Sequence, residues 1–575
     1  MTLRDRWFGR SGLGRAVIVR TGLALLLTCA VYLLGQSGEG TLRVEIRDKT
    51  SGQIVPAMVC ITSATDGTWR TPPDGRTQPR FSTVRDFMQP GGDWKTGDIG
   101  PVRLTNGEYP GGERVPAYGP LSDYPFWQEP AAYFTSKPFS ITLPAGKWRL
   151  AVERGTEYLP VFEDFEIKIG QTRNRTIILQ RWVNMPQQGW YSGDDHVHYP
   201  RNKPVYDEFL MTWSKAEDVH VSNILRMGDI KQTYFEPGNY GKKSRYQEGD
   251  YILATGQEDP RAAIEEQGHA MALNIQGPVR DTSKYHLFDF MFDSIHAQGG
   301  LTGYAHIAWA SEFHRRGHPD RYPTWDPNIN VIQGKVDFFE LLQFRQLGLE
   351  DFYDFLNLGI KLVASAGSDL PWGNTIGESR VYVYTGREFN ADIWFAAMKQ
   401  GHTFVTNGPM LTLRIDNAIP GDELNVSKGR PVRIRARAWA PEIIGSPKKL
   451  EVIAQGQVIR TAESSEPGRQ ELKLDFSLPV GQSQWIAARV STHKDGLAHT
   501  SPVYILVNGK SFAESTDLPQ MIEKRLKRLD FIEARLRDPT FIRDYVPGEI
   551  KPLIDRIEQA RAAYKKLADG RGLGL

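Results

Sequence analysis

The sequence predicts an α/β protein, in which an α/β barrel or layered sheet is flanked by two β-sandwich domains and followed by a helical tail. Three observations predict it. The chain has 575 residues, more than one domain normally holds. Over residues 186–410, short apolar runs alternate with helical patterns. On either side of that segment, apolar and polar residues alternate with the period of half-buried strands.

Residues 1–37 are typical of an export leader. Five arginines stand against one acid before and around an apolar stretch from Leu23 to Leu34. The stretch is short for a bilayer span, but the preceding AVIV lengthens it. Two interpretations stay open: a cleaved signal peptide, and an uncleaved anchor attached to the membrane through residues 16–34. Both predict an exported protein, periplasmic or extracellular.

Composition excludes several classes of function. Without the leader the chain is slightly acidic, which argues against nucleic-acid binding as its main task. There are two cysteines, and the second is Cys60, so neither a disulfide framework nor a cysteine-rich zinc module is possible. A metal site in this protein would have to use histidine and carboxylate ligands.

Two β-sandwiches are expected, one before and one after the central segment. Residues 41–182 open with TLRVEIRD, and further strand patterns return in FSITLPAGKWRLAVERG. A long region rich in Gly, Pro and Asp separates them and predicts a large insert. Residues 411–508 carry six alternating runs, which predict the second sandwich.

Residues 516–568 predict a helical tail. Pro519 suits a first helical turn, and an apolar stripe begins at Ile522 and Leu526 opposite a basic face. One interpretation is a helical hairpin docked on the body of the protein. The other is an arm that forms a homodimer.

The central segment carries the chemistry, beginning with the motif GDDHVH. Residues i and i+2 of a strand point to the same face, so His196 and His198 present two imidazoles to one point. Imidazoles are good ligands for zinc, manganese and iron. Asp194, just before them, is expected to orient a histidine rather than to bind metal itself.

Four further residues follow strand-like runs in order along the chain. Glu258 ends YILATGQE, His269 begins HAMALNI, His306 lies in GYAHIA, and Asp369 ends VASAGSD. An acid at the end of an apolar strand costs free energy unless it is paired or bound to metal. Each residue is ambiguous alone, but the ordered series predicts one metal site at the carboxyl ends of the strands.

These motifs resemble those of a known family. GWYSGDDHVH, GQE followed by His269, GYAHIAW and SAGSDLPWG are similar to the PHP (polymerase and histidinol phosphatase) superfamily of metallohydrolases, and most similar to its carbaryl-hydrolase (CehA/McbA) group. The resemblance covers residues 41–510 and implies a PHP-like distorted (β/α)7 barrel at 186–410. It also implies an N-terminal β-sandwich, here of the carboxypeptidase-regulatory type.

The resemblance implies one or two divalent ions, zinc, manganese or iron. His196, His198 and Asp369 would hold the first, and His269 and His306 the second. The glutamate of the GQE motif would bind or bridge both. PHP proteins usually carry two further histidines, but here Asp229 is followed by Ile230, and Asp369 is followed by Leu-Pro. Both missing ligands would serve a third ion, so three ions are not expected.

Two other residues each have a possible role in the site and a possible structural role. Arg380, in ESRVYV, is a candidate for holding an anionic substrate or oxyanion, or else a structural ion-pair partner. Asn407, in HTFVTNGP, either approaches the site or forms a turn between sheets.

The predicted function is hydrolysis of a small-molecule ester-type bond: a carbamate, carboxyl ester, amide or phosphoester. A metal-activated water would attack, with Asp369 or an unliganded histidine moving the proton. An amidohydrolase-type barrel is an alternative, but YILATGQE offers no lysine for its usual carboxylated ligand. A second alternative is a non-catalytic envelope protein that binds glycan or protein and uses the barrel as a scaffold.

Overall fold

The structure is a computed structural model. It describes residues 38–65, 67, 70, 133–261, 267–307, 324–343, 345–370, 373, 375–494, 496–513, 517–542 and 545–570. The predicted leader at 1–37 and most of the predicted insert lie outside these residues. None of the described helices has the length and apolarity needed to cross a membrane.

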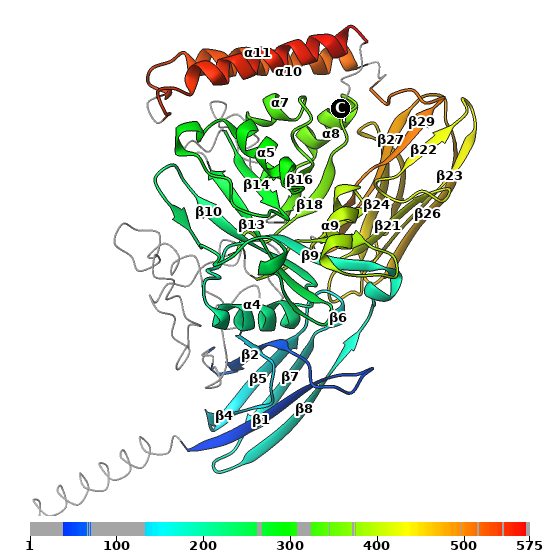
Figure 1. The fold of residues 1–575 in the computed structure, drawn as a ribbon. Helices are drawn as coiled ribbons and strands as arrows, with labels where there is room; N and C mark the ends of the chain where they lie inside the picture. Colours follow the sequence, from blue (N-terminus) through cyan, green and yellow to red (C-terminus); the bar gives the residue numbers. More distant parts are fainter. Residues whose placement is uncertain are drawn as a thin grey trace, which may run out of the picture.

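The N-terminal part is a pair of four-stranded sheets (Figure 1). One has the order β4-β1-β8-β6 and the other β3-β2-β5-β7. Alternating side chains such as Leu42, Val44 and Ile46 fill the core between them. The strands are β1 (Glu39–Asp48), β2 (Ala57–Ser63), β3 (Tyr133–Thr135), β4 (Phe139–Pro144), β5 (Gly146–Glu153), β6 (Tyr158–Leu159), β7 (Val161–Ile167) and β8 (Thr172–Arg181).

The central part is a mixed sheet with helices packed against it. Its strands are β9 (Trp190–Val197), β10 (Val221–Gly228), β11 (Thr233–Tyr234), β12 (Tyr246–Glu248), β13 (Tyr251–Arg261), β14 (His269–Leu273), β15 (Leu301–Tyr304), β16 (Phe338–Gln343), β17 (Gln346–Leu347), β18 (Val363–Ala366), β19 (Arg380–Tyr384) and β20 (Thr403–Thr406). Its helices are α4 (Pro204–Ala216), α5 (Phe288–Ala297), α7 (Pro327–Asn330), α8 (Leu349–Asn357) and α9 (Ala391–Lys399).

The predicted α/β class and its (β/α)7 barrel are wrong. In the described residues strand exceeds helix, and the central and C-terminal strands close into one ring of mixed parallel and antiparallel pairs in place of a barrel of regular strand–helix repeats. Strand β14 pairs antiparallel with both β13 and β15, as do β9 with β19 and β19 with β20. Parallel pairing persists between β9, β10 and β13 and between β15, β16 and β18. Strand–helix alternation in sequence does not reveal the direction in which strands pair, because pairing is decided by contacts distant in the chain.

The C-terminal strands continue the central sheet. β20 pairs with β28, which pairs with β27, so the hydrogen bonding runs on without a break. A separate three-stranded sheet, β21-β23-β26, packs on these strands over a shared apolar core. The strands are β21 (Met410–Ile415), β22 (Glu423–Val426), β23 (Pro431–Trp439), β24 (Pro447–Ala454), β25 (Gln457–Glu463), β26 (Glu471–Pro479), β27 (Gln484–Thr492), β28 (Leu497–Thr500) and β29 (Val503–Val507).

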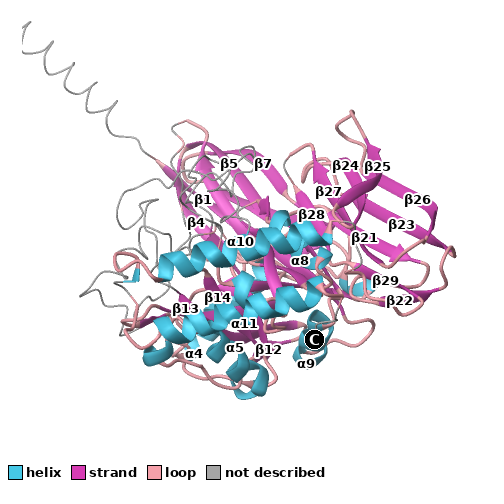
Figure 2. Cartoon of the chain, turned by 90° about the horizontal axis from the view of Figure 1, so that it is seen from above, coloured by secondary structure: helices cyan, strands magenta, loops and turns pink. Residues whose placement is uncertain are grey.

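The tail is a hairpin of two long helices, α10 (Leu518–Leu536) and α11 (Ile550–Ala568). Figure 2 shows them side by side over the helices of the central part. Apolar residues of both, such as Leu529 and Ile557, are buried in the same core cluster as the central strands. The hairpin is therefore docked on the body of this chain.

Candidate metal centre

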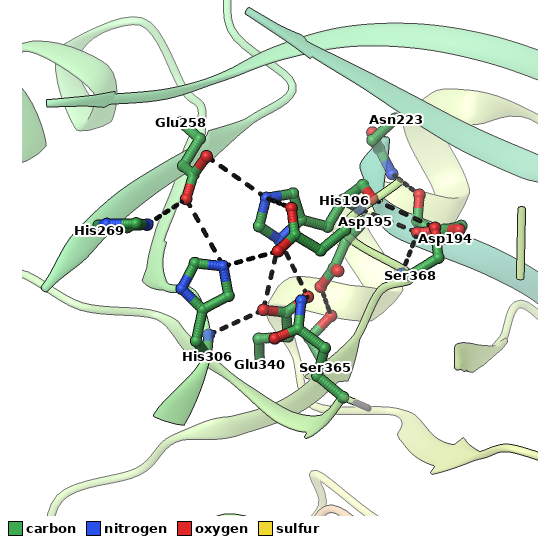
Figure 3. A network of polar contacts seen from close by, with 12 residues as sticks. Asp194, Asp195, His196, Asn223, Glu258, His269, His306, Glu340, Ser365 and Ser368 are labelled. Atoms are coloured by element: carbon green, nitrogen blue, oxygen red, sulfur yellow. Dashed lines mark hydrogen bonds and ion pairs between the residues drawn. The ribbon is translucent and has the colours of Figure 1, made fainter. Parts of the chain in front are cut away.

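Six predicted ligands meet at one end of the central strands, and Figure 3 labels four of them, His196, Glu258, His269 and His306. Each lies at the start of a strand, near its end or just beyond it, and these strands are buried on both faces. His196 and His198 come from β9 and the residues after it, Glu258 from β13, His269 from the start of β14, His306 from just after β15, and Asp369 from just after β18. The sheet thus gathers side chains that are up to 173 residues apart, as 196 and 369 are.

One group of ligand atoms surrounds the HxH motif. The Nε2 atoms of His196 and His198 lie 3.0 Å apart. Glu258 Oε2 is 3.5 Å from the first of these nitrogens and 3.0 Å from the second. Asp369 Oδ1 is 3.3 and 3.6 Å from the same two atoms. Two nitrogens and two oxygens therefore face a common point.

The other oxygens of the same two carboxylates face a second group. Glu258 Oε1 lies 2.6 Å from His269 Nδ1 and 3.7 Å from His306 Nε2. Asp369 Oδ2 lies 3.1 Å from His306 Nε2. Both carboxylates thus stand between the two groups, whereas the resemblance assigned Asp369 to the first alone.

The remaining ring nitrogens of the HxH pair are anchored by the protein. His198 Nδ1 lies 3.0 Å from the carbonyl oxygen of Leu225, and His196 Nδ1 lies 3.1 Å from Glu340 Oε1. Both partners are acceptors, so each Nδ1 carries the proton and each Nε2 is left with its lone pair toward the shared point. This is the arrangement of metal-binding histidines.

Glu340, on β16, is a site residue that the sequence reasoning missed. Its Oε2 also accepts the backbone N–H of His306 at 2.9 Å, and Gln343 Nε2 donates to its Oε1 at 3.2 Å. The side chain is fully buried. The signal was present, since an acid stands inside the apolar run VDFFELLQF, and the same cost argument that identified Asp369 applies to it.

Asp194 joins β9 to the loop that carries Asp369, and Asp195 accepts the hydroxyl of Ser365 on β18. Asp194 accepts the backbone N–H groups of His196 and Ser368, both at 3.0 Å, and of Gly377 at 2.7 Å. Asp194 was expected to orient a histidine, and the contact that it makes is with the backbone N–H of His196. Burial raises the pKa of Asp194 to about 6, against these hydrogen bonds.

Accessibility differs between the two groups. The side chains of His196 and His198 are fully buried, while those of His269 and His306 are 13% and 12% exposed and that of Asp369 is 9% exposed. A substrate can therefore approach only from the side of the second group, as far as the described residues define it.

The cluster holds an excess of buried negative charge. Burial disfavours the charged form of His196, but Asp369, Glu340 and Glu258 outweigh burial and raise its pKa well above the usual range. Burial would raise the pKa of Glu258, but His269 and His196 lower it well below the usual range. Burial lowers the pKa of His269 to about 4, despite Glu258. Glu258 charged and His269 neutral near pH 7 are the states that bind metal, whereas on His196 a bound ion would take the place of the proton that the surrounding carboxylates favour.

Two ligands have left-handed backbone. His306 has φ of 56° and Asp369 has φ of 51°, a region that residues other than glycine seldom adopt. Phe235, also at positive φ (54°), stacks on the His198 ring at 5.5 Å between ring centres. Such strain is maintained only where surrounding contacts fix it, and it is typical of functional sites.

The donor set fits divalent metal. Neighbouring ligands around a first-row ion, with bonds of about 2.0–2.2 Å, lie about 3.0–3.6 Å apart. The N···O and N···N separations around His196 and His198 fall at that spacing. Within the described residues there are three overlapping groups of three residues in which the ligand atoms lie within 4.8 Å of one another, and all three groups belong to this cluster.

Three other predicted residues lie elsewhere. Arg380 is 1% exposed and donates from Nε to the carbonyl of Gly377 at 2.8 Å and from Nη1 to that of Glu217 at 3.3 Å, so it takes the structural role. Asp229 accepts N–H groups of its own turn and the Tyr234 hydroxyl at 2.6 Å. Asn407 accepts the N–H of Leu497 at 2.6 Å, in a turn between sheets. None of these contacts reaches the cluster.

No model of a known protein family matches the chain, and no curated protein matches it. Solved structures match over short stretches. The fibronectin(III)-like modules of Clostridium thermocellum CbhA are 17% identical over 17% of this chain and 96% of theirs, with a TM-score of 0.13. A superoxide reductase (neelaredoxin) from Ignicoccus hospitalis is 19% identical over 16% of this chain and 79% of its own, with a TM-score of 0.13. A CARDB domain from Pyrococcus furiosus, in complex with di-metal ions, is 20% identical over 17% of this chain and 94% of its own, with a TM-score of 0.12.

Proposed function

We propose that this protein is an exported metal-dependent hydrolase that cleaves an ester-type bond in a small molecule. The observation that carries the proposal is the convergence of four imidazoles and two carboxylates, with the outer nitrogens of His196 and His198 anchored by Glu340 and Leu225. The ordered motifs, which resemble those of PHP metallohydrolases of the CehA/McbA group, support it. One or two ions of zinc, manganese or iron suit these ligands.

The residues of the cluster have different proposed roles. A bound divalent ion supplies a water that is acidic enough to act as hydroxide near pH 7. His196 and His198 hold the buried side of the site rigid. Asp369 is the most exposed of the three carboxylates, at 9% against 2% for Glu258 and 0% for Glu340, so its Oδ2 is the proton acceptor we assign.

Arg380 is committed to backbone carbonyls outside the cluster, so it is not placed to hold a phosphate. Arg261, at the end of β13, carries a positive charge close enough to lower the pKa of His269. All four substrate classes therefore belong in the test.

The test uses the purified protein, reconstituted with Zn²⁺, Mn²⁺ or Fe²⁺, on aryl carbamates, esters, amides and phosphates. We expect the wild type to release the phenol or arylamine. His196→Ala and His198→Ala should lose bound metal and at least about 100-fold in kcat/KM, because a ligand should cost no less than the outer-shell partners whose loss costs about 10-fold to 100-fold. His402→Ala is the matched control, since His402 pairs with Asp422 at 3.0 Å.

Two results would contradict the proposal. Full hydrolysis and full metal content in both ligand variants would show that the cluster is not the centre. A wild type that binds no metal with every ligand intact would favour a non-catalytic binding protein.

A further inference from the structure

Beyond the metal site itself, the C-terminal hairpin reaches the two most accessible ligands through a chain of buried polar contacts. We propose that Glu549, next to the start of α11, is a positioning residue that holds His269 and His306 in place for the second metal ion. The inference rests on the proposed metal centre and adds a function for the tail.

The chain of contacts begins at the carboxylate of Glu549, which is 1% exposed. Its Oε1 accepts the backbone N–H of His286 at 2.8 Å, and its Oε2 lies 2.7 Å from His286 Nδ1. Tyr545 packs its ring on the same imidazole, with 4.2 Å between centres. His286 is therefore held on two sides by the tail.

From His286 the contacts continue to Gln267, two residues before His269. Gln267 Nε2 donates to the carbonyl of His286 at 2.7 Å and to Asp326 Oδ2 at 3.2 Å. Gln267 is fully buried. Gly268, between Gln267 and the ligand, has φ of 106° and no room for a side chain against Thr324. The approach to His269 is thus closely packed.

Asp326 then carries the contacts to Tyr304, two residues before His306. The Tyr304 hydroxyl donates to Asp326 Oδ1, which also accepts from Asn330 Nδ2 at 2.6 Å. The two ligand segments are joined directly as well, because the N–H of Ala305 donates to the carbonyl of His269 at 3.1 Å. We call Glu549, His286, Gln267, Asp326 and Tyr304 the brace.

A second contact from the tail holds the same region. Tyr564, on α11, donates to the carbonyl of Asn328 at 3.1 Å, and Arg525, on α10, donates to its side-chain oxygen at 2.8 Å. Asn328 lies two residues after Asp326. The first ligand pair differs, since the ring contacts of His196 and His198 run to Glu340 and Leu225 within the central sheet. Loss of the tail contact should therefore weaken one metal position and spare the other.

The experiment is a Co²⁺ titration of the metal-free full chain, in which binding is measured by calorimetry and by visible absorption. The wild type should bind two ions in separable steps. The weaker step is assigned to the second ion if it is lost in His269→Ala. In Glu549→Ala that step should lose about 10-fold to 100-fold in affinity, as outer-sphere substitutions do. The other step should stay within about twofold of the wild type. Glu549→Gln, which keeps one acceptor, should recover part of the loss.

Two further variants make the result decisive. Asp555→Ala, in an exposed pair with Lys551 on the same helix, is the control and should change neither step. Gln267→Leu leaves the Glu549–His286 contact in place and should reproduce the selective loss, so it decides the matter if Glu549→Ala fails to fold.

Equal weakening of both steps, or no weakening in either brace variant, would overturn the positioning role. A wild type that binds a single ion untouched by His269→Ala would overturn it too, while leaving the hydrolase proposal standing. A wild type that binds no Co²⁺ would remove the metal centre, and the brace with it.

Discussion

The carboxylate of Glu340 illustrates how one residue orients two ligands. It accepts from His196 Nδ1 at 3.1 Å, from the backbone of His306 at 2.9 Å and from Gln343 at 3.2 Å. A carboxylate can accept all three at once, and this fixes the tautomer of His196. An amide in its place would turn an N–H₂ group toward one of these donors.

We therefore expect Glu340→Gln to weaken metal binding by about 10-fold to 100-fold without removing a ligand. Calorimetric titration with Zn²⁺ measures it. Glu463→Gln, on the exposed strand β25, is the control and should bind as the wild type does. Undiminished affinity in Glu340→Gln would mean that the contact with His196 is incidental.

At the scale of elements, α4 ends against the loop that carries Asp369. Its C-cap residue is Glu217, whose Oε1 accepts the Thr375 hydroxyl at 2.6 Å, and Thr375 Oγ1 accepts the Trp213 indole N–H at 3.0 Å. Burial raises the pKa of Glu217 from 4.5 to about 7, while Thr375 and Arg380 oppose the rise. The helix end thus contains a carboxyl group that is more easily protonated folded than unfolded.

The sign of the pH effect follows from that direction. The stabilising contribution is complete below pH 4.5 and is lost as the pH rises through about 7. We expect Glu217→Gln to gain stability relative to the wild type between pH 5 and pH 8, by about 3 kcal/mol at most. Thermal unfolding at a series of pH values measures this, with exposed Glu208→Gln on the same helix as control. Parallel pH curves for wild type and Glu217→Gln would refute it.

At the scale of the whole molecule, buried charges fasten the parts together. Between the N-terminal sheets and the central sheet, Asp218 pairs with Arg181 at 2.8 Å and with Arg154 at 3.2 Å. Between the tail and the central helices, Arg525 pairs with Asp351 and Asp354, both at 2.8 Å, and its guanidinium lies 4.2 Å from the ring centre of Phe355.

Removing one partner of a buried pair costs about 3–5 kcal/mol where it leaves the other charge unpaired, but here each of the two carboxylates keeps a second basic partner on α10, at 2.8 and 2.7 Å. We therefore expect Arg525→Met to loosen the tail by less than that cost, so that amide hydrogens of α10 and α11 exchange faster by about 10-fold, the equivalent of about 1.4 kcal/mol. Lys527→Met, in an exposed pair with Glu523, is the control and should exchange as the wild type does. Equal exchange in the two variants would show that apolar packing alone docks the hairpin.

The sequence by itself identified most of the side chains that form the candidate site. The i, i+2 spacing of His196 and His198, and acids and histidines at the ends of apolar runs, are local patterns, and the structure brings those six residues together. Glu340 carried the same kind of signal within its strand. The patterns are local because a strand's faces and ends are set by neighbouring residues.

Only the tertiary structure decided how the strands pair and what surrounds the ligands. The α/β prediction failed because alternation of strands and helices does not show that β13, β14 and β15 run antiparallel, or that β20 continues into the C-terminal strands. The contact of Arg380 with the carbonyl of Glu217 and the brace from Glu549 also join residues far apart in the chain. Such contacts depend on which buried polar groups find partners when the whole chain packs, and no short stretch of sequence contains that information.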